Sequence, residues 1–262
     1  MIPFFQITSL EIGPITLQAW GTMLALAFAV GIYLSSRELK KRGGEPDRII
    51  DVSFWVILFA VIGARFFYVL GNLDLFRENW IGVLKFWEGG AALIGGIAGA
   101  LVVFLIYIRK KKIPFWELAE PIVFVLPLSI FIGRIGCFLI HDHMGKITNV
   151  PWGMEYIDGM VRHETTLYNG LSALLLFCLF LVVKRFNWSQ TKGFFTTVFL
   201  LWYGVSRFIT DFFRADDLPT SDPRWFGFTP TQYVSVVMIG ISLYLYKHNK
   251  TINLKRNKYE KK

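Results

Sequence analysis

The residues with the clearest chemical potential are three arginines inside apolar stretches. Arg65, Arg134 and Arg207 stand in runs made mostly of aliphatic, aromatic and glycine residues. A charged side chain in the hydrocarbon core of a membrane costs roughly 2.5 kcal/mol or more, so each guanidinium must face a partner or a wet cavity. Because a guanidinium matches the oxygens of a phosphate, we expect a site for an anionic ligand. The alternative is that the arginines reach towards lipid headgroups or pair with Asp142 and Asp211.

The second arginine lies in the most distinctive stretch of the chain, residues 127–145. Gly133-Arg134-Ile135-Gly136 follows about a dozen apolar residues, and the run ends in His141-Asp142-His143. Flanking glycines allow another helix or a ligand headgroup to approach the backbone closely. A structural arginine paired with a carboxylate in a helical bundle remains the alternative.

The third arginine belongs to a polar stripe. Tyr203, Arg207 and Asp211 are spaced i, i+4 and i+8, which places them on one face of a helix. An Asp four residues after an Arg can hold the guanidinium in place. The stripe therefore predicts a helix face directed into the interior of a bundle.

The composition defines the class of protein that must position these residues. The chain has 262 residues, of which 54% are hydrophobic and only 18% charged. Soluble domains rarely combine these fractions, so we predict an integral membrane protein. The net charge of +9 does not indicate a nucleic-acid partner, because the basic residues fall in short loops and in the C-terminal tail.

The apolar runs predict an all-α membrane protein with seven transmembrane helices. A hydrocarbon core of about 30 Å needs about 20 residues of helix. The stretches of suitable length are Ile15–Ser35, Val52–Leu70, Ala91–Ile108, Ile122–Ile140, Leu167–Val183, Phe195–Phe213 and Thr231–Tyr246. We expect residues 1–262 to form one polytopic domain, with 247–262 as a basic cytoplasmic tail.

The distribution of basic residues predicts the orientation. The first, third and fifth loops and the tail hold five, four, three and seven Lys or Arg residues, against six in the other loops together. The positive-inside bias therefore predicts an N-terminus outside and a C-terminus inside. In this orientation the three intramembrane arginines lie towards the outer face.

At this point the sequence resembles the prolipoprotein diacylglyceryl transferase family. The family signature G-R-x-G-N-F-x-N-x-E-x-x-G corresponds to residues 133–145, which read G-R-I-G-C-F-L-I-H-D-H-M-G. Further similarity covers nearly the whole chain. It includes Trp20-Gly21, Gly63-Ala64-Arg65 with Tyr68, Trp87-Glu88-Gly89-Gly90, Arg162-His163, Leu167-Tyr168, the Tyr203/Arg207/Asp211 stripe with Phe212-Phe213-Arg214, and Thr231-Gln232.

The resemblance implies transfer of a diacylglyceryl group from phosphatidylglycerol to the lipobox cysteine of a prolipoprotein signal peptide, with release of glycerol phosphate. It implies an enzyme of the bacterial cytoplasmic (inner) membrane with its active site towards the outer face, no cofactor and no metal. Preorganised cations stabilise a leaving phosphate. We assign catalysis to Arg134, Arg207, His141, Asp142 and Tyr203. We assign substrate binding to Arg65, Arg134, Gly136, Cys137, Gly145, Asp211, Arg214, Gly95 and Gly96.

Several positions depart from the family pattern. Ile94 stands where the family has a histidine that is a candidate base, and isoleucine cannot take a proton. Cys137 and Ile140 replace the signature asparagines, and Asp142 replaces the glutamate. A thiol with an ordinary pKa near 8.5 must become a thiolate, and a histidine at the membrane interface can accept its proton. His141 and His143, which flank Asp142, and His163 in the same outer region can supply such a base, and we assign the role to His141. The alternative is that these histidines lie at the interface without a catalytic role.

Other functions remain open at this stage. The protein can instead be a non-catalytic descendant that binds phospholipid or signal peptide, or a paralogue that uses another acceptor. His141, Asp142, His143 and His163 carry zinc-type donor atoms, although H-D-H is not a recognised metal motif. Cys137 can be a nucleophile or a buried packing residue. Against a transporter, no internal repeat is visible.

Overall fold

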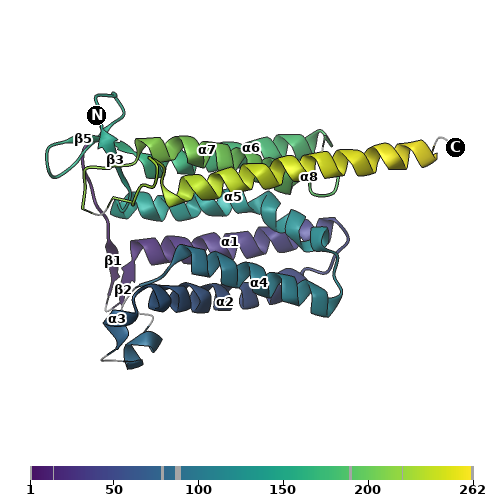
Figure 1. Cartoon of the computed structure of the whole chain (residues 1–262), viewed down its shortest axis with the longest axis horizontal. Helices are drawn as coiled ribbons and strands as arrows, with labels where there is room; N and C mark the ends of the chain where they lie inside the picture. Colours follow the sequence, from purple (N-terminus) through teal and green to yellow (C-terminus); the bar gives the residue numbers. More distant parts are fainter. Residues whose placement is uncertain are drawn as a thin grey trace. The chain divides into compact units, whose positions relative to one another are not determined.

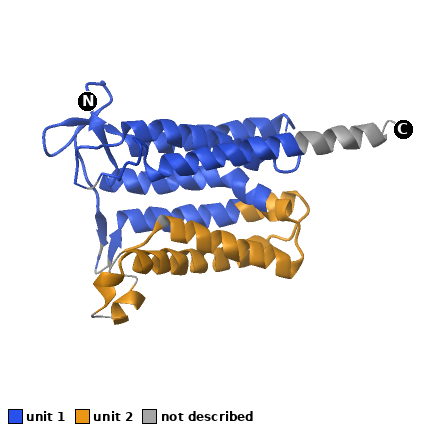
Figure 2. Ribbon diagram, in the orientation of Figure 1, with its two compact units in different colours: residues 1–34, 119–262 blue, residues 35–118 orange. Residues whose placement is uncertain are grey.

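The structure is a computed structural model that describes residues 2–13, 15–77, 80–85, 90–188, 191–219 and 221–260. Within these ranges it leaves the side chains of residues 12, 15, 93 and 249–260 undescribed. Trp87, Glu88 and Gly89 of the family resemblance lie outside the described residues. The chain divides into two compact units, residues 1–34 with 119–262 (unit 1) and residues 35–118 (unit 2), which Figure 2 colours separately.

A long helix occupies each of the seven predicted stretches (Figure 1). They are α1 (Ala19–Lys41), α2 (Asp47–Gly71), α4 (Leu93–Lys111), α5 (Phe115–Ile140), α6 (Thr165–Arg185), α7 (Phe194–Thr210) and α8 (Pro230–Glu260). Shorter helical turns are α3 (Leu73–Phe76), η1 (Trp80–Leu84) and η3 (Asp211–Phe213). Among the described residues, α1, α2, α5 and α6 are long and apolar enough to cross a membrane. The count of seven spans and the orientation stay predictions.

The all-α prediction is wrong in detail, because two small antiparallel sheets lie among the helices. Strands β1 (Ser9–Ile12) and β2 (Ile15–Gln18) form a hairpin, with Ser9 opposite Gln18 and Ile12 opposite Ile15. The second sheet has the order β3 (Met144–Ile147), β5 (Val161–Glu164), β4 (Met154–Glu155). The first predicted span therefore began too early. Residues 15–18 alternate apolar and polar side chains, which suits a strand, and the helix starts only at Ala19.

Unit 1 is held together by aromatic packing between α5, α6 and α7. Phe124 of α5, Phe180 of α6 and Phe195 of α7 are buried, and the Phe180 and Phe195 rings lie 4.9 Å apart. Helix α7 also packs closely on α8, because a Cβ added to Gly204 would lie 3.1 Å from the Ser235 carbonyl oxygen. The buried carboxylate of Glu120 accepts a hydrogen bond from the Thr196 backbone N–H at 3.1 Å and so caps the start of α7.

Unit 2 is built on a glycine contact between α2 and α4. A Cβ added to Gly63 of α2 would lie 3.2 Å from the Cα of Gly99, and Gly63 and Gly95 approach each other even more closely. Small residues at such a crossing let two backbones pack directly, as in membrane helix pairs.

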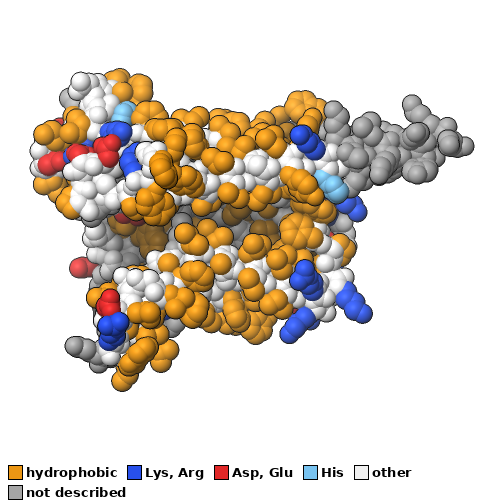
Figure 3. Space-filling view, in the orientation of Figure 1, with side chains coloured by type: hydrophobic (Ala, Val, Ile, Leu, Met, Phe, Trp, Pro, Cys, Tyr) orange, Lys and Arg blue, Asp and Glu red, His pale blue; other side chains and the backbone are white. Residues whose placement is uncertain are grey.

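The outer surface agrees with a membrane protein. Hydrophobic side chains cover the flanks of the helices in Figure 3, whereas charged side chains gather towards the helix ends. Large apolar residues such as Phe54 and Val237 are about 60% exposed, at 62% and 60%. Such broad apolar exposure is unfavourable in water and is compatible with contact with lipid.

Candidate functional site: an arginine cluster in unit 1

Helices α5, α6 and α7 of unit 1 bring Arg134 and Arg207 together. Helix α6 passes so close to Arg134 that a Cβ on Gly170 would lie 3.3 Å from the Arg134 Cβ. The groups that hydrogen-bond the Arg134 guanidinium are the Tyr203 hydroxyl and the Cys137 thiol. Both partners are neutral, so within the part of the chain that the structure describes no directly bonded carboxylate cancels the charge of Arg134. Asp142 attracts it only as a neighbouring charge.

The predicted stripe on α7 is assembled as expected from its spacing. Arg207 Nη2 lies 3.2 Å from Asp211 Oδ1, and Arg207 also interacts electrostatically with Arg134. Arg207 is 7% exposed and Asp211 is fully buried. Tyr203 bonds to Arg134, while Asp211 holds the guanidinium of Arg207.

Asp211 is itself held by the start of α8. The hydroxyl of Thr229 donates to Asp211 Oδ2 at 2.5 Å, and the hydroxyl of Thr231 donates to the same oxygen. Thr229 and Gln232 form a reciprocal capping box, in which the Thr229 N–H donates to Gln232 Oε1 at 2.9 Å and the Gln232 N–H to Thr229 Oγ1 at 3.3 Å. The first turn of α8 thus orients Arg207 through Asp211.

A third arginine, Arg214, lies at the edge of this cluster. Its backbone pairs with Gly145, and its Nη1 lies 2.6 Å from Asp222 Oδ2. Arg214 interacts electrostatically with Arg207 and with His143. The cluster is therefore formed by α5, α7 and the segment after η3, and its cationic groups are Arg134, Arg207 and Arg214.

His141 does not face this cluster. It is 3% exposed, its Nδ1 lies 3.1 Å from Glu164 Oε2, and its Nε2 donates to the Phe5 carbonyl at 2.5 Å. The rings of Phe4, Phe5, Phe138 and Tyr156 surround it. Desolvation opposes its protonation, but the bonds to Glu164 and Phe5 outweigh that effect and raise its pKa. Because both ring nitrogens are engaged by acceptors, the structure argues against His141 as the base.

His143 has the geometry that His141 lacks. It is half-buried, and its Nδ1 donates to the Asp142 carbonyl at 2.7 Å, which leaves Nε2 as the proton acceptor of the neutral ring. Burial lowers its pKa, and the charges of Arg214 and Arg134 add to this effect against the attraction of Asp142. A neutral histidine therefore lies beside the arginine cluster. A left-handed backbone at His141 (φ 52°) turns the chain between the two histidines.

The remaining candidates in unit 1 surround Arg134 or support the nearby loops. Asp142 is exposed, and Cys137 is buried between Arg134 and Trp20. A Cβ on Gly136 would lie 2.9 Å from Met23 Cβ, and one on Gly145 would lie 2.8 Å from the Phe213 carbonyl oxygen. The two glycines are thus needed for close packing, and their contact with substrate stays a prediction.

Arg65, Gly95 and Gly96 belong to unit 2. Arg65 is 6% exposed and donates to the carbonyls of Gly82 at 2.6 Å, Val83 at 3.0 Å and Gly90 at 3.0 Å. Gly95 and Gly96 pack α4 against α2. As described, Arg65 holds the segment between α3 and α4 in place, and its predicted role in substrate binding stays untested.

His163 bonds to a tyrosine hydroxyl and is not part of a metal-ligand cluster among the described residues. Its Nδ1 is 2.8 Å from the Tyr168 hydroxyl, which also accepts a hydrogen bond from Trp152 Nε1 at 3.0 Å. Burial lowers the pKa of His163. Among the described residues, no three His, Cys, Asp or Glu side chains are grouped so that they could hold a metal ion.

Two groups that support the site were not predicted from the sequence. Thr229-Pro230-Thr231-Gln232 carries a legible helix-start signature, Thr three residues before Gln with Pro at the first helical position, and this signal could have placed the start of α8. Glu164 and Tyr156 hold His141, with the Tyr156 hydroxyl donating to Glu164 Oε2 at 2.6 Å. No sequence signal connects these residues across the chain.

The fold and this cluster define a helical membrane protein that carries partly or fully buried arginines close to a neutral histidine. The chain belongs to the prolipoprotein diacylglyceryl transferase family, a family of transferases, whose match covers residues 8–247.

Named relatives share the similarity over most of their length. A phosphatidylglycerol--prolipoprotein diacylglyceryl transferase of Thermosynechococcus vestitus is 32% identical, and the alignment covers 92% of each chain. The protein of the same name from Lactiplantibacillus plantarum is 30% identical, over 92% of this chain and 89% of its own. The one from Listeria monocytogenes is 29% identical, over 90% and 86%.

Proposed function

We propose that this chain transfers the diacylglyceryl group of phosphatidylglycerol to the lipobox cysteine of a prolipoprotein. The observation that carries the proposal is the proximity of Arg134 and Arg207, with Arg134 bonded to the neutral Tyr203 and Cys137 and to no carboxylate among the described residues. The relatives bear the name of this activity, and the chain belongs to their family.

In the proposed step, the cysteine sulfur attacks the carbon of the diacylglyceryl group that carries the phosphate. A thioether C–S bond forms, the C–O bond to the phosphate breaks, and glycerol phosphate leaves with the electron pair. The leaving phosphate gains negative charge, which Arg134 and Arg207 stabilise in a site shielded from water. Asp211, held by Thr229 and Thr231, keeps the Arg207 guanidinium oriented before the substrate arrives.

The thiol proton needs an acceptor, and the proposal assigns it to Nε2 of His143. His143 is neutral at neutral pH because burial and the nearby arginines lower its pKa. Its Nδ1 donates to the Asp142 carbonyl, so the ring tautomer leaves Nε2 free to accept. This assignment replaces the lost family histidine at Ile94 with a residue at the edge of the arginine cluster. Asp142, next to His143, supplies negative charge that favours the imidazolium after proton transfer.

The location proposed for this reaction is the outer face of the bacterial cytoplasmic membrane. The charge distribution in the loops supports an outer N-terminus and an inner basic tail. Phosphatidylglycerol then reaches the cluster from the bilayer, and the acceptor arrives as a signal peptide. The step as written uses no cofactor.

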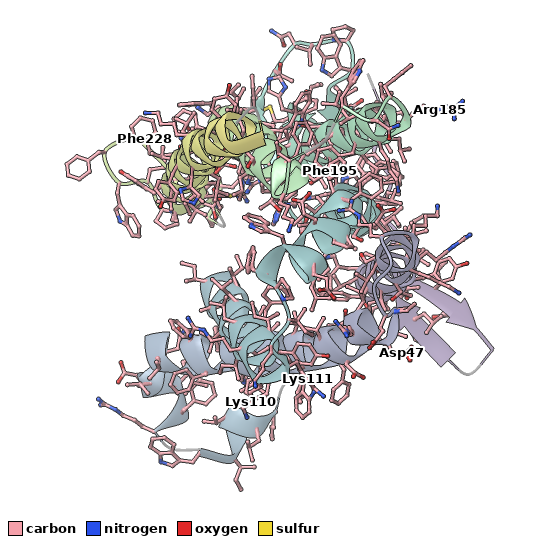
Figure 4. All side chains as sticks on the ribbon, turned by 90° about the vertical axis from the view of Figure 1, so that its right-hand side faces the viewer. Asp47, Lys110, Lys111, Arg185, Phe195 and Phe228 are labelled. Atoms are coloured by element: carbon pink, nitrogen blue, oxygen red, sulfur yellow. The ribbon has the colours of Figure 1, made fainter. Side chains whose placement is uncertain are left out.

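Complementation tests the proposal in a bacterium depleted of its own diacylglyceryl transferase, with the mobility shift of a reporter lipoprotein as the readout. Wild type, Arg134→Ala and His143→Gln are compared with Arg185→Ala, a matched arginine at the exposed end of α6 that Figure 4 labels. We expect lipidation with wild type and Arg185→Ala and its loss in the other two. Lipidation retained at the level of Arg185→Ala by Arg134→Ala or by His143→Gln would contradict the role assigned to that residue.

A second candidate is a binding protein that kept the anion site and lost the chemistry. The replacement of the family histidine by Ile94 favours it. Native mass spectrometry of the purified protein with phosphatidylglycerol separates the two. Retained lipid that depends on Arg134, together with no lipidation of the reporter by the inserted wild type, would overturn the transferase proposal and support the binding protein.

A further inference from the structure

A short hairpin at residues 225–228 precedes α8 in unit 1. The Trp225 N–H donates to the Phe228 carbonyl at 2.9 Å, and the Phe228 N–H donates to the Trp225 carbonyl at 3.0 Å. The two residues between them, Phe226 (φ 50°) and Gly227 (φ 84°), both have a left-handed backbone. This is the pattern of a type I′ turn, whose first central position favours Asn, Asp or Gly. A phenylalanine is unusual at this position, so turn formation alone does not explain its presence.

The aromatic rings at this turn are directed away from the protein. Phe226 is 97% exposed, the highest value among the large apolar residues described, and Trp225 is 58% exposed. Two neighbouring aromatic rings in water are unfavourable, because apolar surface is driven out of water. Their exposure therefore points to a partner surface that is absent from the isolated chain.

The base of the hairpin is anchored firmly. The Tyr233 hydroxyl donates to the Trp225 carbonyl at 2.6 Å, and the Phe228 ring packs against Phe208 at 5.9 Å and Phe212 at 6.2 Å. Phe228 is labelled beside the α8 ribbon in Figure 4. The tip is thus presented by α7 and α8 in a fixed position and is not simply a loose loop.

The position of the hairpin identifies the partner. Phe226 lies four residues before Pro230, where α8 begins, and α8 exposes Val234, Val237 and Ile241 on a surface suited to lipid. An element directly before such a helix lies at the level where the helix enters the bilayer. Tryptophan and other aromatic side chains are enriched at that depth, where apolar rings meet headgroups.

We propose that the Trp225–Phe228 hairpin is an anchor in the membrane interface, with Phe226 and Trp225 inserted between lipid headgroups. Arg224 Nη2 donates to the Arg214 carbonyl at 3.2 Å, so the anchor is linked to the arginine cluster. Fixing the hairpin at headgroup depth also fixes Arg214 close to the level of lipid phosphates. The anchor requires only that the protein is in a membrane, and it holds whether or not the chain is a transferase.

Site-directed spin labelling of the full chain in phosphatidylglycerol and phosphatidylethanolamine vesicles tests the anchor. Single cysteines are placed by Phe226→Cys, Glu155→Cys and Val237→Cys in a background without Cys137 and Cys178. Glu155 is exposed on β4 and serves as the aqueous control, and Val237 serves as the lipid control. Accessibility to oxygen and to a water-soluble nickel chelate gives the depth of each label. Monodisperse elution and an unchanged melting temperature show that each variant is folded.

We expect the label at residue 226 to lie between the two controls, with nickel accessibility several-fold below that at residue 155. Nickel accessibility equal to that at residue 155 would overturn the anchor. Protection that appears only after a lipobox signal peptide is added would also overturn it and would identify the hairpin as a peptide-docking element instead.

A second variant tests whether the Phe226 ring itself holds the hairpin in the membrane interface. Phe226→Asn preserves the turn, because Asn accepts a left-handed backbone, but removes the ring. A spin label at Trp225→Cys is compared with and without this change. We expect nickel accessibility at residue 225 to rise when the phenylalanine is lost and the melting temperature in detergent to stay the same or increase. An unchanged label depth would contradict the proposal, since Phe226 would then contribute nothing to insertion.

Discussion

Arg65 in unit 2 and Arg207 in unit 1 are both buried arginines in apolar helices, yet the partners that the structure describes for them differ in kind. Arg65 donates to three backbone carbonyls, which are fixed by the local fold. Arg207 pairs with Asp211 and lies near Arg134, which bonds to Tyr203 and has no bonded carboxylate among the described residues. Carbonyl oxygens satisfy a guanidinium and occupy its donors, whereas a neutral hydroxyl beside two neighbouring arginines leaves positive charge that attracts an anion.

The comparison shows that an arginine in an apolar run is not a functional residue by its position alone. Arg65 tethers a segment of its own unit, and the neighbouring rings of Tyr68 and Phe76 lie 5.6 Å and 5.5 Å from its guanidinium carbon. Function is expected where two or more arginines meet around groups that do not neutralise them. The following predictions test this distinction.

The largest expected effect is that of Arg207→Lys. A lysine retains the charge but cannot present two parallel N–H groups to a phosphate, so we expect lipidation to fall by about 10³-fold. The measurement is the rate of diacylglyceryl transfer to a lipobox peptide by purified protein in phosphatidylglycerol micelles. A matched Arg65→Lys variant should lose less activity per folded molecule. Equal losses in both would break the distinction between the two environments.

His143→Gln should lower the transfer rate by about 10²-fold, because general base catalysis contributes at least this much. The pH profile gives a sharper result. Since the pKa of His143 is lowered, the base stays neutral at mildly acid pH. The acid limb of the wild-type pH–rate profile should therefore have its midpoint below about pH 6.5. The limb should be missing from the His143→Gln profile. An unchanged limb in that variant would assign the titration to another group.

Arg65→Met should affect the free energy of unfolding more than the rate of diacylglyceryl transfer by the folded protein. Methionine removes the hydrogen bonds that Arg65 donates to the Gly82, Val83 and Gly90 carbonyls in a buried region, and we expect a loss of about 2 kcal/mol. Thermal unfolding in detergent measures it, with Arg77→Met, an arginine 75% exposed, as the control. A melting temperature equal to that of the control would show that the three carbonyls find other partners.

The smallest expected effect is the pH dependence that His141 confers. The pKa of His141 is raised in the folded state. Its contribution to the free energy of unfolding is therefore complete below its unfolded pKa, near 6.5, and is lost as pH rises through the folded pKa. We expect His141→Gln to reduce stability by about 1 kcal/mol at acid pH and by less at alkaline pH. Thermal unfolding followed across pH 5–9 checks this. A variant with the same pH dependence as wild type would place the titrating group elsewhere.

The sequence was a good guide to the helices, because continuous apolar runs of about 20 residues are a strong signal. The predicted stretches Val52–Leu70 and Leu167–Val183 fall inside α2 and α6. The β1–β2 hairpin was missed, since hydropathy alone does not distinguish the alternating residues 15–18 from the start of the helix that follows. The β3–β5–β4 sheet was missed because its strands are only two to four residues long.

The site was predictable only where its members share one helix. The spacing of Tyr203, Arg207 and Asp211 was sufficient to place them together. The difference between His141 and His143 was not predictable, because it depends on Phe5 and Glu164, which lie 136 and 23 residues away in the chain. Likewise, the carbonyls that engage Arg65 belong to η1 and to Gly90, and no spacing in the sequence indicates that they contact Arg65.

The boundaries between the two units fall within helices and not within loops. Residues 34 and 35 both belong to α1, and residues 118 and 119 both belong to α5. A chimera that exchanges unit 2 with that of a relative therefore cannot be joined at these boundaries without splicing two helices in mid-turn. Crossover points in the turns at residues 42–46 and 112–114 keep α1 and α5 whole, and libraries recombined there should retain far more inserted protein.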